Sequence, residues 1–222
     1  MTEFYSKSDI HLKYSFSLHA LYEDMKNDNF PLFLRGDVVL TNNHRSLFAR
    51  LIRFAGRLRG SNPEVNHVEM YLGNGTSFSA DVKMCKHDIE RYFKGKHDIY
   101  FYRCIVLSES ERDKLIAESM LWEGKPYDIL GILWQALDAV TGNGFSKKHN
   151  TDKLAYCSEL LQRIYWKIKR RVSKKVVGEA TPDDIRIYIS QSKIWRLVFS
   201  IRKEGKEWVI KVPEPYGVRR TK

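Results

Sequence analysis

The sequence predicts an α+β fold in which an antiparallel sheet packs against helices. Segments in which polar and apolar residues alternate, as in half-buried strands, lie mainly in the first half of the chain, and segments with a helical apolar period dominate the second half. Hydrophobic residues make up 43% of the 222 residues, enough to fill the core of a globular domain. We therefore expect a single domain over residues 1–222, with a core at about 33–200 and extensions at 1–32 and 204–222.

The predicted strands follow from turn signals and from alternation. The most regular strand begins at His67, where His67, Glu69 and Tyr71 alternate with apolar residues and therefore share one face. A Gly-Asn-Gly turn at 73–75 follows this strand and predicts a hairpin. The remaining predicted strands are a β-branched run after the Gly36-Asp37 turn and the stretches 99–107 and 194–203.

The predicted helices are supported by caps and by apolar residues at helical spacing. Ser108 or Ser110 suits the N-cap of a helix that ends near Gly124. Thr181, followed by Pro182 and two acidic residues, gives another strong start signal. Further helices are predicted from periodicity at 15–28, at 44–60, at 129–140 and from Cys157 onward.

Composition and charge narrow the classes of protein that fit the chain. The formal net charge is +11 at neutral pH, and six of the nine residues from 167 to 175 are basic. Such a run fits either a solvated helix end or a patch that contacts an anionic membrane surface; we do not expect nucleic acid as the main partner. No stretch reaches the ~20 apolar residues of a membrane span, and the N-terminus has no signal-peptide pattern. We therefore expect a cytoplasmic protein, and a phage-encoded enzyme would share these features.

The cysteines and histidines form no disulfide or metal-binding pattern in the sequence. Cys85, Cys104 and Cys157 are an odd set without C-x-x-C spacing. The seven histidines include no pair at metal-ligand spacing with acidic neighbours. The sequence also has no glycine-rich phosphate loop of the kind that nucleotides need. We therefore expect no metal ion and no cofactor.

Cys157 stands at the start of its predicted helix, and two interpretations of it are open. The unpaired N–H groups at a helix N-terminus stabilise a thiolate and can form part of an oxyanion hole. A thiolate nucleophile also needs a base, and His67 lies on a rigid strand with the carboxylate of Glu69 two residues further on. Taken alone, however, a helical cysteine and a strand histidine are more often packing or surface residues.

Five short motifs together resemble the NlpC-type papain-like superfamily of thiol hydrolases. They are GKPYD at 124–128, CSEL at 157–160, RGDVVL at 35–40, HVEMYLGNG at 67–75 and FSA at 78–80. In papain the cysteine helix comes first, whereas here the histidine hairpin precedes it. This order resembles the circularly permuted branch of the superfamily, the YaeF/YiiX-like proteins. The resemblance implies a circularly permuted papain-like fold.

The resemblance also implies roles for individual residues. Cys157 would be the nucleophile, His67 the general base, and Tyr127 a group that assists the oxyanion or the substrate. The residue that orients His67 is open between two candidates. The family position just before the alanine holds Ser79, whereas Glu69 faces the same side of its strand as His67, and we favour Glu69.

The activity expected from this resemblance is that of a cysteine hydrolase or acyltransferase, which would break an amide or ester bond through a thioester intermediate. The resemblance implies a peptide or amino-acid amide, as in cell-wall fragments, or a lipid as the substrate. The alternative is a non-catalytic binding protein that uses its basic surface on nucleic acid or on anionic lipid. The reactivity of Cys157 distinguishes these two hypotheses.

Overall fold

The computed structural model of the chain describes residues 33–42, 63–81, 83–94, 97–128, 154–204 and 207–211, together with residues 23, 26, 57 and 141. The helices that we predicted at 15–28, 44–60 and 129–140 lie outside the described residues, apart from residues 23, 26 and 57. Within the described part, every helix is too short or too polar to cross a membrane.

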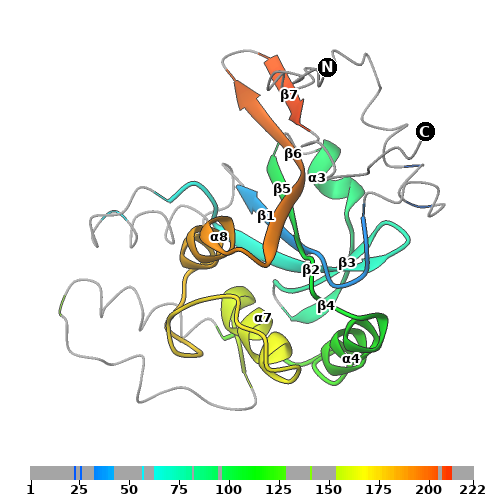
Figure 1. Cartoon of the computed structure of the whole chain (residues 1–222), viewed down its shortest axis with the longest axis vertical. Helices are drawn as coiled ribbons and strands as arrows, with labels where there is room; N and C mark the ends of the chain where they lie inside the picture. Colours follow the sequence, from blue (N-terminus) through cyan, green and yellow to red (C-terminus); the bar gives the residue numbers. More distant parts are fainter. Residues whose placement is uncertain are drawn as a thin grey trace, which may run out of the picture.

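A single antiparallel sheet forms the centre of the described structure (Figure 1). Its seven strands run in the order β4-β3-β2-β1-β5-β6-β7, and each neighbouring pair is antiparallel. Together with the helices, this sheet confirms the predicted α+β class. The strands are β1 (Val38–Asn42), β2 (His67–Gly73), β3 (Thr76–Ala80), β4 (Met84–Asp88), β5 (Asp98–Cys104), β6 (Trp195–Glu204) and β7 (Glu207–Lys211).

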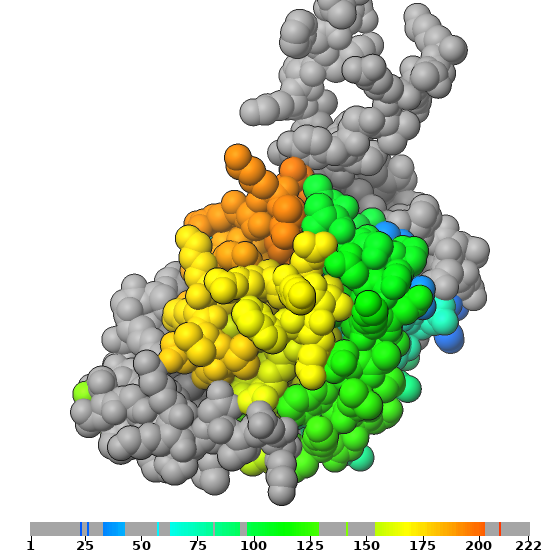
Figure 2. All heavy atoms as spheres, turned by 60° about the horizontal axis from the view of Figure 1, so that its bottom comes forward, coloured from blue at the N-terminus to red at the C-terminus, as the bar shows by residue number. Residues whose placement is uncertain are grey.

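Four described helices accompany the sheet. They are α3 (Glu90–Lys94), α4 (Glu109–Met120), α7 (Cys157–Trp166) and α8 (Pro182–Gln191). In Figure 1, α4, α7 and α8 gather on one side of the sheet, and α3 lies apart from them. The space-filling view in Figure 2 shows α4 in green beside the yellow segment that contains α7, so these helices form one outer face of the molecule.

The helix starts agree with the capping signals in the sequence. Ser108, and not Ser110, is the N-cap of α4, and it forms a capping box with Glu111. Thr181 forms the corresponding box with Asp184 at the start of α8, where a proline occupies the first turn. Both boxes satisfy backbone N–H groups that would otherwise lack partners.

The turns that precede the site depend on backbone conformations that favour glycine. Gly73 and Gly75 have φ values of +100° and +69° in the hairpin between β2 and β3. Gly36, at +80°, turns the chain into β1, and the Asp37 carboxylate accepts a hydrogen bond from the Leu34 N–H at 2.9 Å within the same turn. These turns fix the direction in which β1 leaves the Gly36 turn and the direction in which β3 leaves the hairpin.

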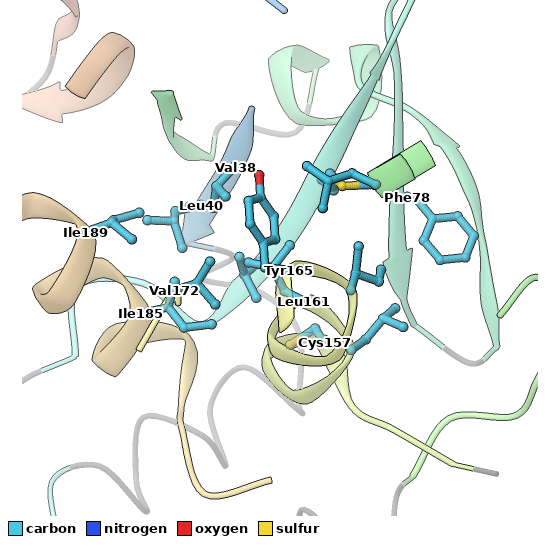
Figure 3. Close-up of a cluster of buried hydrophobic side chains, with 14 of the residues drawn as sticks. Val38, Leu40, Phe78, Cys157, Leu161, Tyr165, Val172, Ile185 and Ile189 are labelled. Carbon is cyan, nitrogen blue, oxygen red and sulfur yellow. The ribbon is translucent and has the colours of Figure 1, made fainter. Parts of the chain in front are cut away.

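The alternation along the strands creates a separate core on each face of the sheet. On the helix side, Leu40 and Met70 pack with Leu161 and Tyr165 of α7. Figure 3 shows the Leu161 and Tyr165 side chains on the helix face that is turned toward β1, with Cys157 at the end of the same helix. The opposite core contains Phe101 and its aromatic neighbours. The sheet thereby places β2 between α7 on one face and α3 on the other.

Candidate active site

The N-terminus of α7 presents Cys157 at a helix end that the side chain of the N-cap residue does not cap. Cys157 is the first residue of α7, after Tyr156 in extended conformation. The Tyr156 side chain makes no cap hydrogen bond, whereas Ser108 and Thr181 close the starts of α4 and α8. The backbone N–H groups of the first turn therefore suit a negative charge beside the cysteine sulfur.

His67 lies at the start of β2 and contacts both Cys157 and Glu69. Its Nε2 atom is 3.0 Å from Glu69 Oε1, and its ring also hydrogen-bonds the Cys157 side chain. Because Nε2 faces Glu69, Nδ1 is the ring nitrogen left for the sulfur. Burial alone would lower the pKa of His67, but the negative charges of the Cys157 thiolate and of Glu69 outweigh burial and raise it to about 10. The imidazolium form of His67 is therefore favoured at neutral pH.

Glu69 is a buried carboxylate with an unusually complete set of hydrogen-bond donors. Its side chain has no exposed surface, and only donors compensate such burial. Burial would raise the pKa of Glu69, but the hydrogen bond to His67 and the positive charge of Arg91 hold it well below its ordinary value. Glu69 is consequently ionised. Its other donors are Ser77, Ser79, Arg91 and Tyr92.

The structure brings both candidate orienting residues to the same nitrogen of His67. Glu69 Oε1 is 3.0 Å from Nε2, and Ser79 Oγ is 3.3 Å from the same atom. Ser79 also donates to Glu69 Oε1 at 2.9 Å. The serine therefore supports the carboxylate that we favoured from the sequence, and the charged partner is the nearer of the two.

Tyr127 lies next to the chain segment that leads into α7. It forms a parallel bridge with Ala155, and the backbone N–H of Asp128 bonds to the Ala155 carbonyl at 3.2 Å. The Tyr127 side chain hydrogen-bonds Cys157. Burial, followed by the nearby thiolate charge, raises the pKa of Tyr127 well above its ordinary value. The phenol therefore stays protonated and can donate its O–H to an oxygen beside the sulfur.

Three residues of this site were not predicted from the sequence. Ser77 lies two residues before Ser79 on β3, and period two would have placed both on the face of Glu69. Arg91 and Tyr92 belong to α3, a short helix that we did not predict. Arg91 also contacts Asp81 at 2.9 Å, so it ties Glu69 to the strand connection beyond Ala80. Only the folded chain brings these groups together.

A second cysteine–histidine pair, on β4, differs from the first in its electrostatics. Cys85 Sγ is 3.5 Å from His87 Nε2. Burial raises the pKa of Cys85, and the nearby Asp81 charge raises it further. Burial also lowers the pKa of His87, so this pair favours the neutral thiol and the neutral ring. The two pairs provide a natural comparison within one molecule.

The chain resembles a solved structure over most of its length. The crystal structure of the metalloprotein YiiX from Escherichia coli O157:H7 matches with a TM-score of 0.52 at 17% sequence identity, covering 77% of this chain and 97% of that protein. The chain thus has a YiiX-like fold. No protein-family model matches the chain, and no curated protein matches it.

Proposed function

We propose that the protein is a cysteine hydrolase or acyltransferase that acts on an amide or ester bond through a thioester on Cys157. The observation that carries this proposal is the chain of contacts from Cys157 through His67 to the ionised Glu69, at a helix N-terminus without a side-chain cap. A thiolate, an imidazolium and an orienting carboxylate are the three parts that thiol acyl transfer requires.

The first half of the reaction forms the thioester. The Cys157 thiolate attacks the carbonyl carbon, and the oxygen takes up the negative charge. The Cys157 backbone N–H and the Tyr127 O–H stabilise this oxyanion. The His67 imidazolium then gives its proton to the leaving amine or alcohol as the bond to the carbonyl carbon breaks, which leaves an acyl group on sulfur and a neutral imidazole.

The second half releases the acyl group and restores the charges. Neutral His67 accepts a proton from water, or from the hydroxyl or amine of an acceptor, as that group attacks the thioester carbonyl. The thiolate leaves, and the imidazolium is regenerated. Glu69 stabilises the imidazolium in both halves, and Arg91 and Ser79 hold the carboxylate in place.

We extend the proposal to the papain-like NlpC-type superfamily and to its circularly permuted branch. The YiiX-like fold supports this assignment, as do the five sequence motifs. In chain order, the histidine strand β2 precedes the cysteine helix α7, as the permuted arrangement requires. The substrate would be a peptide, an amino-acid amide or a lipid.

The fold neighbour is called a metalloprotein, so we tested whether the described residues could hold a metal ion. Among them, no three His, Cys, Asp or Glu side chains converge on a common point in a suitable arrangement. Glu69 is also paired with the Arg91 guanidinium, whose positive charge opposes a metal cation at this carboxylate. We therefore assign no step to a metal.

Alkylation by a small reagent tests the proposal. Iodoacetamide should modify Cys157 faster than Cys85 near neutral pH, although Cys157 is only 2% exposed and Cys85 is partly exposed. The His67→Ala variant should lose most of this reactivity, because the imidazolium no longer stabilises the thiolate. Peptide mapping by mass spectrometry gives the rate at each cysteine.

The matched control is His87→Ala, which removes the histidine beside Cys85 and should leave the Cys157 rate unchanged. Incubation with small p-nitrophenyl esters should also leave an acyl adduct on Cys157. If Cys85 reacts as fast as Cys157, or if both histidine variants behave alike, exposure alone governs reactivity and the hydrolase proposal is wrong.

A further inference from the structure

A basic cavity lies at the other end of α7, away from Cys157. Its volume is about 340 Å³, and it opens between the last turn of the helix and the loop that follows. Its lining includes Trp166, Arg170, Arg171, Lys174 and Lys175. We propose that this cavity and its rim bind the phosphate headgroups of an anionic membrane surface.

The charges at this site are only partly neutralised by the protein. Carboxylates of neighbouring elements pair with half of the six cations in the run 167–175: Lys167 with Glu118 at 3.9 Å, Arg170 with Glu111 at 2.9 Å and Lys175 with Asp184 at 2.9 Å. Within the described residues, Lys169, Arg171 and Lys174 have no carboxylate within 4.0 Å, and all three are exposed. A surface with uncompensated cations attracts phosphate groups.

Apolar side chains stand among these cations. Trp166 is 56% exposed and Val176 is 67% exposed. The guanidinium of Arg171 lies 5.7 Å from the centre of the Trp166 ring, so charge and aromatic surface are presented together. A protein site that binds at a membrane interface combines these two features. Its cations bind the lipid headgroups, and its apolar side chains insert at the boundary between headgroups and acyl chains.

Val176 favours lipid over nucleic acid as the partner. Nucleic acid would bind the cations through its phosphates and could stack a base on Trp166. An aliphatic side chain such as Val176 would contribute little to that binding. At a membrane, by contrast, each buried apolar group adds to binding.

The loop that carries these side chains is held in place from within the core. The buried Gln162 donates to the carbonyls of Lys175 and Val176 at 3.1 and 3.4 Å, and it accepts from the Gly178 N–H at 3.3 Å. The cations and Val176 are therefore presented in a fixed arrangement, which lowers the entropy cost of binding. Figure 2 shows this yellow segment at the surface beside α4.

The proposed membrane site is independent of the proposed chemistry. Trp166 follows Cys157 by nine positions, which corresponds to about 14 Å along a helix. Lipid binding can therefore be measured in the full chain whether or not Cys157 reacts.

Vesicle cosedimentation tests the proposal directly. The full chain should bind vesicles of phosphatidylcholine mixed with phosphatidylglycerol, and it should not bind vesicles of phosphatidylcholine alone. The triple variant K169Q/R171Q/K174Q should bind the mixed vesicles roughly a hundredfold more weakly, since each of the three cations near the surface contributes about fivefold. The matched control K86Q/K114Q/K193Q removes the same charge from exposed lysines elsewhere and should bind like the wild type.

Two further measurements make the test specific to lipid. Val176→Ser should weaken binding to the mixed vesicles, and the fluorescence of Trp166 should shift to the blue on binding, which Trp166→Phe abolishes. Equal losses in the two triple variants would show that net charge alone matters and would overturn the proposal. Salt-sensitive retention on DNA that needs the three cations but not Val176, without vesicle binding, would assign the surface to nucleic acid instead.

Discussion

At the scale of single residues, the site depends on burying a negative charge beside a histidine. Isolated in the sheet, the Glu69 carboxylate would be strongly destabilising. The donors around it come from β2, β3 and α3, so the carboxylate is satisfied only once all three elements are in place. The negative charge then favours the imidazolium form of His67.

The charge coupling between Cys157 and His67 gives the first prediction. The thiolate is the largest of the influences that raise the pKa of His67, so Cys157→Ala should lower this pKa from about 10 toward its ordinary value of 6.5. An NMR titration of the His67 ring protons measures the change. Cys104→Ala removes a thiol from the core without touching the site and serves as the control. An unchanged His67 pKa in Cys157→Ala would contradict the ion pair.

The depressed pKa of Glu69 gives a prediction for stability against pH. Because the folded-state pKa lies below the ordinary value of 4.5, the ionised carboxylate stabilises the fold above that pH, and this contribution is lost as the pH falls below it. At neutral pH, Glu69→Gln should lower the free energy of unfolding by about 2–3 kcal/mol, since the partly buried Arg91 guanidinium loses its charged partner. Urea unfolding at several pH values measures both proteins.

The difference between wild type and Glu69→Gln should shrink steadily in acid. Asp37 and Glu159, whose pKa values are raised by burial, titrate in both proteins and cancel in the comparison. If the difference in the free energy of unfolding stays constant down through acid pH, Glu69 stabilises the fold through the shape of its side chain and not through its charge.

The residues of the site could be predicted from the sequence only where local periodicity places them. Period two puts His67 and Glu69 on one face, and their hydrogen bond confirms this placement. Arg91 follows Glu69 by 22 residues, and no local pattern links them. The sequence also left Ser79 and Glu69 as alternatives, because it could not show that both reach the same nitrogen of the histidine.

At the scale of elements, α7 joins the two surfaces for which we propose roles. Its N-terminus carries Cys157, and its C-terminal end opens into the basic loop. Helix α7 ends at Trp166, and the turns after it reach Lys169, which has a φ of +56° and whose N–H bonds to the Trp166 carbonyl. The next N–H, of Arg170, bonds to the Tyr165 carbonyl, so this is a Schellman arrangement with lysine where glycine is usual.

The left-handed conformation of Lys169 predicts a stabilising substitution. Lys169→Gly should raise the free energy of unfolding by about 0.5–1 kcal/mol, because a β-carbon is disfavoured at this φ and glycine is not. Lys169→Ala keeps the β-carbon while removing the same charge, so it should give no such gain. Urea unfolding midpoints compare the two variants. A gain of equal size in Lys169→Ala would assign the effect to relief of charge repulsion in the basic run.

Elements with caps or strong periodicity could be predicted, and short edge elements could not. The capping serines and threonines gave the starts of α4 and α8. Strand β4 pairs only with β3 at the sheet edge, and its sequence, Met-Cys-Lys-His-Asp, has no clear apolar face. Helix α3 has five residues, too few to show a helical period. Helix α3 supplies Arg91 and Tyr92 to Glu69, so one of the missed elements completes the site.

At the scale of the whole molecule, one sheet carries two cores, and each stabilises the other. The same strands supply Leu40 and Met70 to the helix-side core and Phe101 to the opposite one. Loss of either core would expose one face of these strands to water. It would thereby weaken the strands that support the other core. This sharing supports our proposal that the described residues form a single domain, which should unfold in one cooperative transition.

Strand β7 tests how far this domain extends toward the C-terminus. It lies in the stretch that we assigned to an extension from residue 204, yet it pairs with β6 through five register positions from Ser200 to Glu204. Deletion of residues 205–222 removes these pairs and leaves β6 as the sheet edge. We expect a loss of about 3 kcal/mol in the free energy of unfolding, since each ladder hydrogen bond contributes about 0.5–1.5 kcal/mol.

The deleted protein should still unfold in a single transition, because Phe199 and Ile201 of β6 remain packed in the core opposite the helices. Thermal unfolding followed by circular dichroism measures both the midpoint and the number of transitions. Deletion of residues 212–222 alone retains β7 and is the matched control. If the two deletions cost the same, β7 adds nothing to the domain, and its boundary lies at β6. If the longer deletion abolishes folding, β7 belongs to the core that positions β2 and its histidine.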